Sequence, residues 1–144
     1  MKKLLTILAL TLMSSAMAQN WLTDFQKAKE IAAKENKQIV MVFQGSDWCA
    51  PCIKLDREIW STSTFIDYST ANFVLVKVDF PKRKKNALPE AQTFANAQLA
   101  EKYNTGGIFP FVVLVNATGE VLGETGYKKM SPENYIEVLN AFTK

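Results

Sequence analysis

Two cysteines three positions apart constrain this chain more than any other feature. Cys49 and Cys52 follow an apolar run typical of a buried strand, at residues 38–43, and they open a helical pattern that continues to residue 60. A helix start presents unpaired N–H groups and the positive end of the helix dipole, which should favour the thiolate form of Cys49. We therefore expect Cys49 to attack other sulfurs, and Cys52, one turn further in and more shielded, to resolve the product.

The cysteine pair permits three interpretations. A permanent disulfide across so short a ring would restrict the unfolded chain little, by about 2 kcal/mol in the loop-entropy model. A zinc site needs four ligands, whereas the chain has 2 cysteines and no histidine, so carboxylates would have to complete it. We favour a redox pair that opens and closes, with no metal and no cofactor beyond the Cys49–Cys52 disulfide.

The residues from Gly45 to Cys52 read Gly-Ser-Asp-Trp-Cys-Ala-Pro-Cys. Here the sequence resembles the thioredoxin superfamily, specifically the exported thioredoxin-like proteins that carry a Gly-Ser-Asp-Trp-Cys-x-x-Cys signature. The resemblance extends from about residue 38 to the C-terminus. It implies an α/β domain with a thioredoxin-like fold, in which helices flank both faces of a central mixed β-sheet.

Two further segments carry the resemblance. Pro110 stands in an apolar strand pattern, and the resemblance implies that its peptide bond is cis and that it lies against the two cysteines. It also implies that Phe109, just before the proline, exposes backbone that pairs with a substrate strand. An ordinary trans proline on an edge strand is the alternative. The third match is a hairpin, with a turn at residues 116–119 and a strand at residues 120–125.

Three neighbours of the cysteines are candidates for supporting roles. Trp48 is expected to shape the docking surface and Asp47 to tune its charge, although a packed indole and a capping carboxylate would explain the same residues. Pro51 falls in the first helical turn, where its missing N–H does no harm, and its stiffness should hold the sulfur pair in place.

The chain departs from ordinary thioredoxins at one position. The resemblance implies a buried acid in the first core strand that relays protons to the inner cysteine, but Val42 or Phe43 stands there. Proton transfer at Cys52 must then use water or another group. Lys77 matches a lysine that often lies near that acid, and with the acid absent we expect Lys77 at an edge or facing solvent.

The first 18 residues have the features of a signal peptide. A basic start with Lys2 and Lys3 precedes an apolar run at residues 4–13 and a small-x-small site that ends at Ala18. We expect export to the periplasm or secretion, cleavage after Ala18, and one thioredoxin-like domain at residues 19–144. The run is too short to span a membrane, so we expect no stable membrane insertion after cleavage; an uncleaved anchor is the alternative.

The charge of the chain excludes some partners. The 17 basic and 14 acidic residues become 15 and 14 once Lys2 and Lys3 are removed, which leaves the mature protein close to neutral. This balance argues against nucleic acid or an anionic membrane as the main partner. Four cations, Lys82, Arg83, Lys84 and Lys85, lie in a basic loop at residues 81–86. The loop is either simply solvated or a contact for an acidic partner surface.

The rest of the chain reads as scaffold. Hydrophobic periodicity predicts helices and strands in alternation, without repeats or a second domain. We expect helices at residues 21–36, 50–60, 63–69 and 90–103 and a last helix that starts at Ser131-Pro132, and strands at residues 38–43, 72–80, 108–115 and 120–125.

The sequence therefore predicts a thiol–disulfide oxidoreductase that acts on exported proteins. The Ala50-Pro51 dipeptide is closer to that of reducing thioredoxins than to the histidine-containing dipeptides of strong oxidants, so we expect reduction of substrate disulfides. The resemblance implies a membrane-embedded thiol reductase as electron donor, and we expect a monomer. The alternatives are a disulfide oxidase or isomerase, and a binding module or chaperone that holds partners without turnover.

Overall fold

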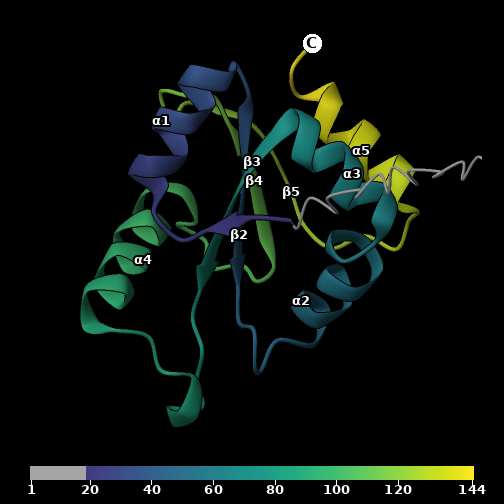
Figure 1. Ribbon diagram of the computed structural model, residues 1–144. Coiled ribbons are helices and arrows are strands. Elements are labelled where there is room, and N and C mark those ends of the chain that lie inside the picture. The colour runs from purple at the N-terminus through teal and green to yellow at the C-terminus, as the bar shows by residue number, and fades with distance from the viewer. Residues whose placement is uncertain (1–18) are drawn as a thin grey trace, which may run out of the picture.

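Strands and helices alternate along residues 19–144, the part of the chain that the computed structural model describes (Figure 1). In chain order they are β1 (Trp21–Leu22), α1 (Phe25–Glu35), β2 (Gln38–Gln44), α2 (Ala50–Leu55), α3 (Ser63–Asn72), β3 (Phe73–Asp79), α4 (Glu90–Tyr103), β4 (Phe111–Val115), β5 (Val121–Thr125) and α5 (Pro132–Ala141). A π-helical turn, Asp56–Trp60, continues α2, and a 3₁₀ turn, Lys84–Asn86, lies in the loop after β3. The predicted signal peptide lies outside the described residues.

The strands form one mixed sheet between two layers of helices. Their order is β1-β3-β2-β4-β5, in which β1, β3 and β2 run parallel and β4 and β5 are antiparallel to their neighbours. Helices α1 and α4 cover one face of the sheet, and α2, α3 and α5 cover the other (Figure 1). This arrangement confirms the predicted α/β architecture with helices on both faces.

The central strand β2 shows why the sheet has two cores. Its side chains alternate between the faces, so Val40 and Val42 pack on the side of α2, α3 and α5, while Met41 and Phe43 pack on the side of α1 and α4. All four are fully buried. A strand buried on both faces reads as a continuous apolar run, which is why residues 38–43 could be recognised from the sequence.

The first predicted helix is partly wrong. Residues 21 and 22 form the short strand β1, which pairs with β3, and the helix begins only at Phe25. Asp24 caps it by accepting hydrogen bonds from the backbone N–H groups of Gln26 and Lys27. The third helix is longer than predicted and ends at Asn72. Within residues 19–144, none of the helices is long and apolar enough to cross a bilayer.

The candidate site lies where the parallel strands β2 and β3 end. Both carboxyl ends reach the lower edge of the sheet in Figure 1, and the turn into α2 and the basic loop leave from the same edge. Ligand and catalytic sites of open α/β sheets commonly lie outside this edge. The fold therefore brings the Cys-x-x-Cys segment and the basic loop together, although about 30 residues separate them in sequence.

A buried asparagine holds the loop that leads to Pro110. Asn104 follows α4, and its amide donates to the carbonyl of Ile108 at 2.8 Å and accepts from the N–H of Ile108 at 3.0 Å. Only 5% of the Asn104 surface is exposed. One side chain therefore satisfies both backbone groups of Ile108, two residues before the proline.

Replacing this asparagine should destabilise the protein. We expect Asn104→Ala to lower the free energy of unfolding by about 1–3 kcal/mol, because two hydrogen bonds worth about 0.5–1.5 kcal/mol each are lost. Urea unfolding followed by circular dichroism measures the change. Asn72→Ala is the control, because its exposed side chain makes one local hydrogen bond to the carbonyl of Tyr68. Equal losses in the two variants would contradict the role given to Asn104.

Candidate active site

The two cysteines are joined by a disulfide at the start of α2. Their Cα atoms are 5.2 Å apart, and Cys49 is the residue that caps the helix. The Sγ atom of Cys49 accepts the backbone N–H of Cys52 at 3.3 Å. A hydrogen-bond donor thus already points at the sulfur that would carry negative charge after reduction.

The two cysteines are equally shielded in this disulfide form. Each has 4% of its surface exposed, so the expectation that Cys52 is more shielded than Cys49 is wrong for this state. The reason is the capping geometry, since the Cys49 side chain turns back toward the helix instead of toward solvent. Pro51, which lies between them, is exposed.

Gly45 makes the turn that delivers Cys49 to the helix. Its carbonyl accepts hydrogen bonds from the backbone N–H of Trp48 at 3.3 Å and of Cys49 at 2.9 Å. The Trp48 indole lies directly over Gly45, and a Cβ atom there would overlap the ring. The glycine is therefore required by this close approach of the indole.

The residues on either side of Asp47 are tied to the end of β3. Ser46 donates its backbone N–H and its hydroxyl to the two carboxylate oxygens of Asp79, at 2.9 and 2.6 Å. The indole Nε1 of Trp48 donates to the carbonyl of Phe80 at 2.7 Å. These bonds fix the turn before Cys49 against the neighbouring parallel strand.

Asp47 holds the basic loop. Its carboxylate accepts the backbone N–H groups of Lys82 and Arg83 and the side-chain amide of Asn86, each at 2.9 Å. The hydrogen bond from the Lys82 backbone, followed by that from the Asn86 amide, lowers the pKa of Asp47 from 3.8 to about 2. The Asp47 carboxylate therefore accepts backbone N–H groups as a capping residue does, but these groups belong to the loop at residues 81–86. The residue that caps α2 is Cys49.

Aromatic rings connect the Cys-x-x-Cys turn to the proline loop. Phe109 meets Trp48 edge to face, with ring centroids 5.6 Å apart, and meets Phe80 in the same way at 5.5 Å. The Nζ atom of Lys82 lies 3.9 Å from the Trp48 ring centroid. The Phe109–Pro110 peptide bond is cis, as the resemblance implies, and Pro110 is buried.

Exposed apolar side chains surround this cluster. Trp48 is 39% exposed, Ile53 47% and Ile108 57%. Ile53 faces solvent directly after Cys52, although its apolar side chain would suit the packed side of the helix. Hydrophobic periodicity is a weak guide in α2, which has only 6 residues and passes into a π-helical turn.

A small cavity on the sheet side of α2 contains Cys52. It has a volume of about 220 Å³ and is lined by Gln44, Ser46, Cys52, Ile53, Asp56 and Lys77. The Nζ atom of Lys77 lies 3.6 Å from Oδ1 of Asp56, and 4.9 Å from the ring centroid of Trp21. Asp56 follows Cys52 by four positions, which places both side chains on the same side of the helix.

Lys77 lies at a partly open edge of the sheet, in line with the expectation of an edge or solvent position. Strand β1 pairs with β3 only at Leu75 and Val76, so on that side Lys77 has no strand partner, and its side chain is 29% exposed. In the register of the sheet Lys77 pairs with Val42, whereas Phe43 points to the opposite face. Val42 therefore occupies the position where the resemblance implies an acid.

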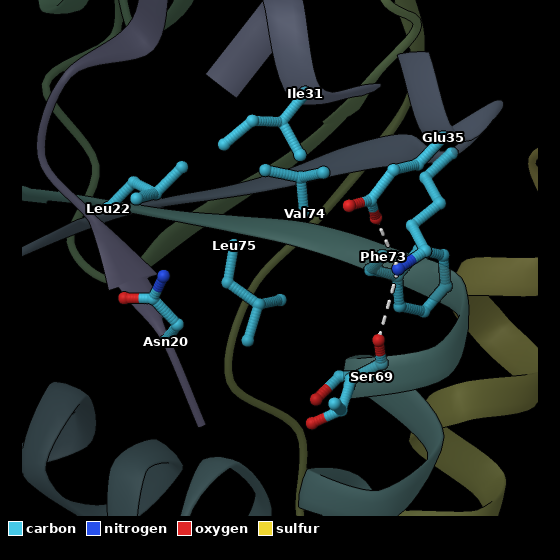
Figure 2. Close-up of a pocket in the computed structure, with 10 residues that line it drawn as sticks. Asn20, Leu22, Ile31, Glu35, Ser69, Phe73, Val74 and Leu75 are labelled. Atoms are coloured by element: carbon cyan, nitrogen blue, oxygen red, sulfur yellow. Dashed lines mark hydrogen bonds and ion pairs between the residues drawn. The ribbon is translucent and has the colours of Figure 1, made fainter. Parts of the chain in front are cut away.

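A second hollow lies at the opposite end of β3 (Figure 2). Its volume is about 260 Å³, and its walls come from β1, α1, α3 and the start of β3. Lys37 lines it, pairs with Glu35 at 2.6 Å and donates to the carbonyl of Thr70 at 3.1 Å. These contacts tie the end of α1 to the end of α3. No sulfur atom lines the hollow, and we assign it a structural role.

Metal binding has no candidate residues in the described part of the chain. Within residues 19–144, no group of three or more Cys, Asp or Glu side chains is arranged to hold a metal ion.

The fold and the helix-capping Cys-x-x-Cys disulfide define a thiol–disulfide oxidoreductase of thioredoxin-like architecture. The chain belongs to the thioredoxin-like domain family, whose model matches residues 25–143. This match starts earlier than the resemblance read from the sequence and includes α1. It confirms the thioredoxin-like family that the resemblance implies.

Two of the similar proteins carry the same name. The disulfide bond reductase DsbH of Chlamydia pneumoniae is 32% identical over 120 residues, which cover 83% of this chain and 70% of that protein. The solved structure of a DsbH oxidoreductase superposes with a TM-score of 0.79 at 30% identity, over 85% of this chain and 83% of the other. A thioredoxin from Thermus thermophilus shares the fold, with a TM-score of 0.63 at 18% identity and 88% coverage of both chains.

The low pKa of Asp47 leads to a testable pH dependence. Because this carboxyl has a lower pKa in the folded protein than in the unfolded chain, its contribution to stability is present above about pH 4 and is lost as the pH falls through about 2. We expect the side-chain carboxyl carbon of Asp47 to titrate with a midpoint near 2 in NMR spectra.

The same titration tests the link to the loop. The amide protons of Lys82 and Arg83 should shift with the Asp47 midpoint, because they are its hydrogen-bond donors. In Asp47→Ala the amide protons of Lys82 and Arg83 should exchange faster with solvent. In the control variant Asp67→Ala, which removes an exposed acid, their exchange rates should not change. A midpoint near 4, or unchanged exchange in Asp47→Ala, would show that the loop is not held in this way.

Proposed function

We propose that this protein reduces disulfide bonds in exported proteins by cycling Cys49 and Cys52 between dithiol and disulfide. The observation that carries the proposal is the Cys49–Cys52 disulfide at the cap of α2, where an N–H group points at the Cys49 sulfur. The similarity to a protein named as a disulfide bond reductase supports the reducing direction. So does the Ala50-Pro51 dipeptide, which has no histidine.

The cycle balances with two electrons and no metal. The Cys49 thiolate attacks one sulfur of a substrate disulfide, the S–S bond of the substrate breaks, and one substrate thiolate leaves. Cys52 then loses its proton and attacks the Cys49 sulfur, which releases the second substrate thiolate and closes the Cys49–Cys52 disulfide. A dithiol donor must return two electrons to this disulfide before the next turnover.

Substrate is held by the surface around the sulfurs. We assign docking to Trp48 and Phe109, which contact each other edge to face beside the disulfide. Phe109 stands directly before the buried Pro110, and we assign its backbone to pairing with an extended substrate segment. Pro51 restrains the first turn of α2 and so the separation of the two sulfurs.

Asp56 and Lys77 supply the proton acceptor that Val42 cannot. Both side chains line the cavity that contains Cys52, and the cavity is large enough for water. The carboxylate of Asp56 takes the Cys52 proton through this water, and the Nζ atom of Lys77, 3.6 Å from Oδ1 of Asp56, holds the carboxylate in place. In this assignment the acid comes from the helix after Cys52 and not from β2.

The cellular setting follows from the sequence. The signal-peptide pattern at residues 1–18 supports export, where disulfides form and a reductase needs a steady supply of electrons. We propose a membrane-embedded thiol reductase as that supply, and protein disulfides as the substrates. A disulfide oxidase or isomerase is the second candidate, because the same cysteine pair can run in the opposite direction.

Turnover of insulin disulfides tests the function directly. Residues 19–144 should accelerate the reduction of insulin by dithiothreitol. With Cys49→Ser the rate of insulin reduction should equal that with dithiothreitol alone, because the attacking sulfur is gone. Cys52→Ser should accumulate mixed disulfides with substrate, which mass spectrometry detects. If the wild type and Cys49→Ser behave alike, the protein is a binding module and not an enzyme.

The reduction potential decides the direction. We expect a value closer to that of thioredoxin, about −270 mV, than to that of the strong oxidant DsbA, about −120 mV. Equilibration with dithiothreitol or glutathione buffers gives this potential. A value near that of the strong oxidant would favour the oxidase.

The role of Asp56 predicts a pH-dependent defect. At pH 7 about 3% of an ordinary thiol is ionised, so loss of the proton acceptor in Asp56→Asn should slow release of substrate from the mixed disulfide by about tenfold. Above pH 9 the thiol ionises without help and the defect should shrink. Stopped-flow measurements of mixed-disulfide decay give both rates. Asp67→Asn on α3 is the matched control, and a defect of the same size at pH 7 and 9.5 would contradict the assignment.

A further inference from the structure

The basic loop carries four cations, and none of their side chains forms an ion pair with a carboxylate within residues 19–144. All four side chains, Lys82, Arg83, Lys84 and Lys85, are exposed. The ion pairs within residues 19–144 involve other residues. The one acid beside the loop is Asp47, and its hydrogen bonds go to backbone N–H groups and to the Asn86 amide.

The loop has a fixed position relative to Cys49. Asp47 stands two residues before Cys49 and binds the loop at three points. Lys82 reaches back over the Trp48 ring, and Trp48 is bound in turn to the Phe80 carbonyl at the start of the loop. A run of charges in a mobile loop would lose entropy when it bound a partner, whereas this backbone is already held.

The positive charge is a local property of this surface. Residues 19–144 contain 15 basic and 14 acidic residues, a net charge of +1, so the molecule as a whole exerts little attraction. Salt screens exposed charges beyond about 8 Å at physiological ionic strength. The loop can therefore act only on groups that dock close to it. Its contacts with Asp47 and Trp48 join it to the turn directly before Cys49.

We propose that the basic loop binds acidic side chains that flank the disulfide of a protein substrate. The preferred substrate segment combines Asp or Glu residues, which meet Arg83, Lys84 and Lys85, with apolar residues, which meet the exposed ring of Trp48. Asp47 acts as a positioning residue, because its hydrogen bonds to Lys82, Arg83 and Asn86 direct the loop. This inference rests on the proposed reduction of protein disulfides and names the class of substrate.

Matched peptides test the substrate preference. Three peptides of one sequence carry a single disulfide flanked by two Glu, two Gln or two Lys residues, and each is mixed with the reduced protein, residues 19–144, in single-turnover stopped-flow experiments. The Glu peptide should be reduced about fivefold faster than the Gln peptide at low salt, and the Lys peptide more slowly than both. At 500 mM salt, a concentration at which the Debye length falls to about 4 Å, the three rates should converge.

Two double variants with the same net charge separate position from total charge. Lys84→Gln with Lys85→Gln should abolish the preference for the Glu peptide. Lys34→Gln with Lys144→Gln should retain it, because Lys34 lies near the end of α1 and Lys144 at the C-terminus, at the opposite end of the sheet (Figure 1). Equal loss of preference in the two variants would overturn the proposal.

Asp47→Ala provides a sharper test. It raises the net charge by one unit, so an effect of total charge would strengthen the preference for the Glu peptide. If Asp47 positions the loop, the preference falls instead. Equal rates for the Glu and Lys peptides in the wild type at low salt would overturn the inference, while reduction of the Gln peptide would show that the proposed function stands. Failure to reduce any of the three peptides would mean that the proposed function itself is wrong.

Discussion

The active site depends on a row of hydrogen bonds between the segments that follow two adjacent parallel strands, β2 and β3. Ser46, Asp47 and Trp48 follow β2 in sequence, and each binds a different part of the segment 79–86 that follows β3. Single hydrogen bonds of this kind contribute about 1 kcal/mol each, but together they leave the turn little freedom. Because Cys49 comes next in the chain, the direction in which α2 starts, and with it the disulfide, is set by this row.

The features predicted correctly from the sequence depend on local patterns. Residues 38–43 are a continuous apolar run, Ser131-Pro132 is a helix cap, and Cys49-Ala50-Pro51-Cys52 is specific in itself. The partners of Asp47 and Lys77 could not be predicted, because they join segments more than 20 residues apart whose pairing leaves no local trace. The spacing of Cys52 and Asp56 was a readable signal, since four positions place two side chains on one side of a helix. Strand β1 was missed because two residues are too few to interrupt a helical pattern.

The proposed use of an acid on the helix, in place of a buried acid on the strand, has an energetic rationale. A carboxylate inside the sheet loses its hydration, and that loss costs several kcal/mol unless partners compensate for it. The side chain of Asp56 is 46% exposed, and Lys77 is its partner at the edge of a cavity. With Val42 in β2 the core remains fully apolar at that position. The protein thus keeps a polar group near Cys52 while it avoids most of the cost of burying one.

The site is assembled from parts that are remote in the sequence, namely residues 45–52, 79–86 and 109–110. Before the sheet forms, the two thiols have neither the helix cap nor the aromatic rings beside them, and they react like any other exposed cysteines. A newly made chain that has not yet folded therefore lacks this site, and its thiols are open to oxidation by the surroundings. The special reactivity of the two cysteines therefore arises only when the tertiary structure forms. Before folding, the cysteines are substrates of thiol–disulfide exchange, and after folding they form a site that can carry it out.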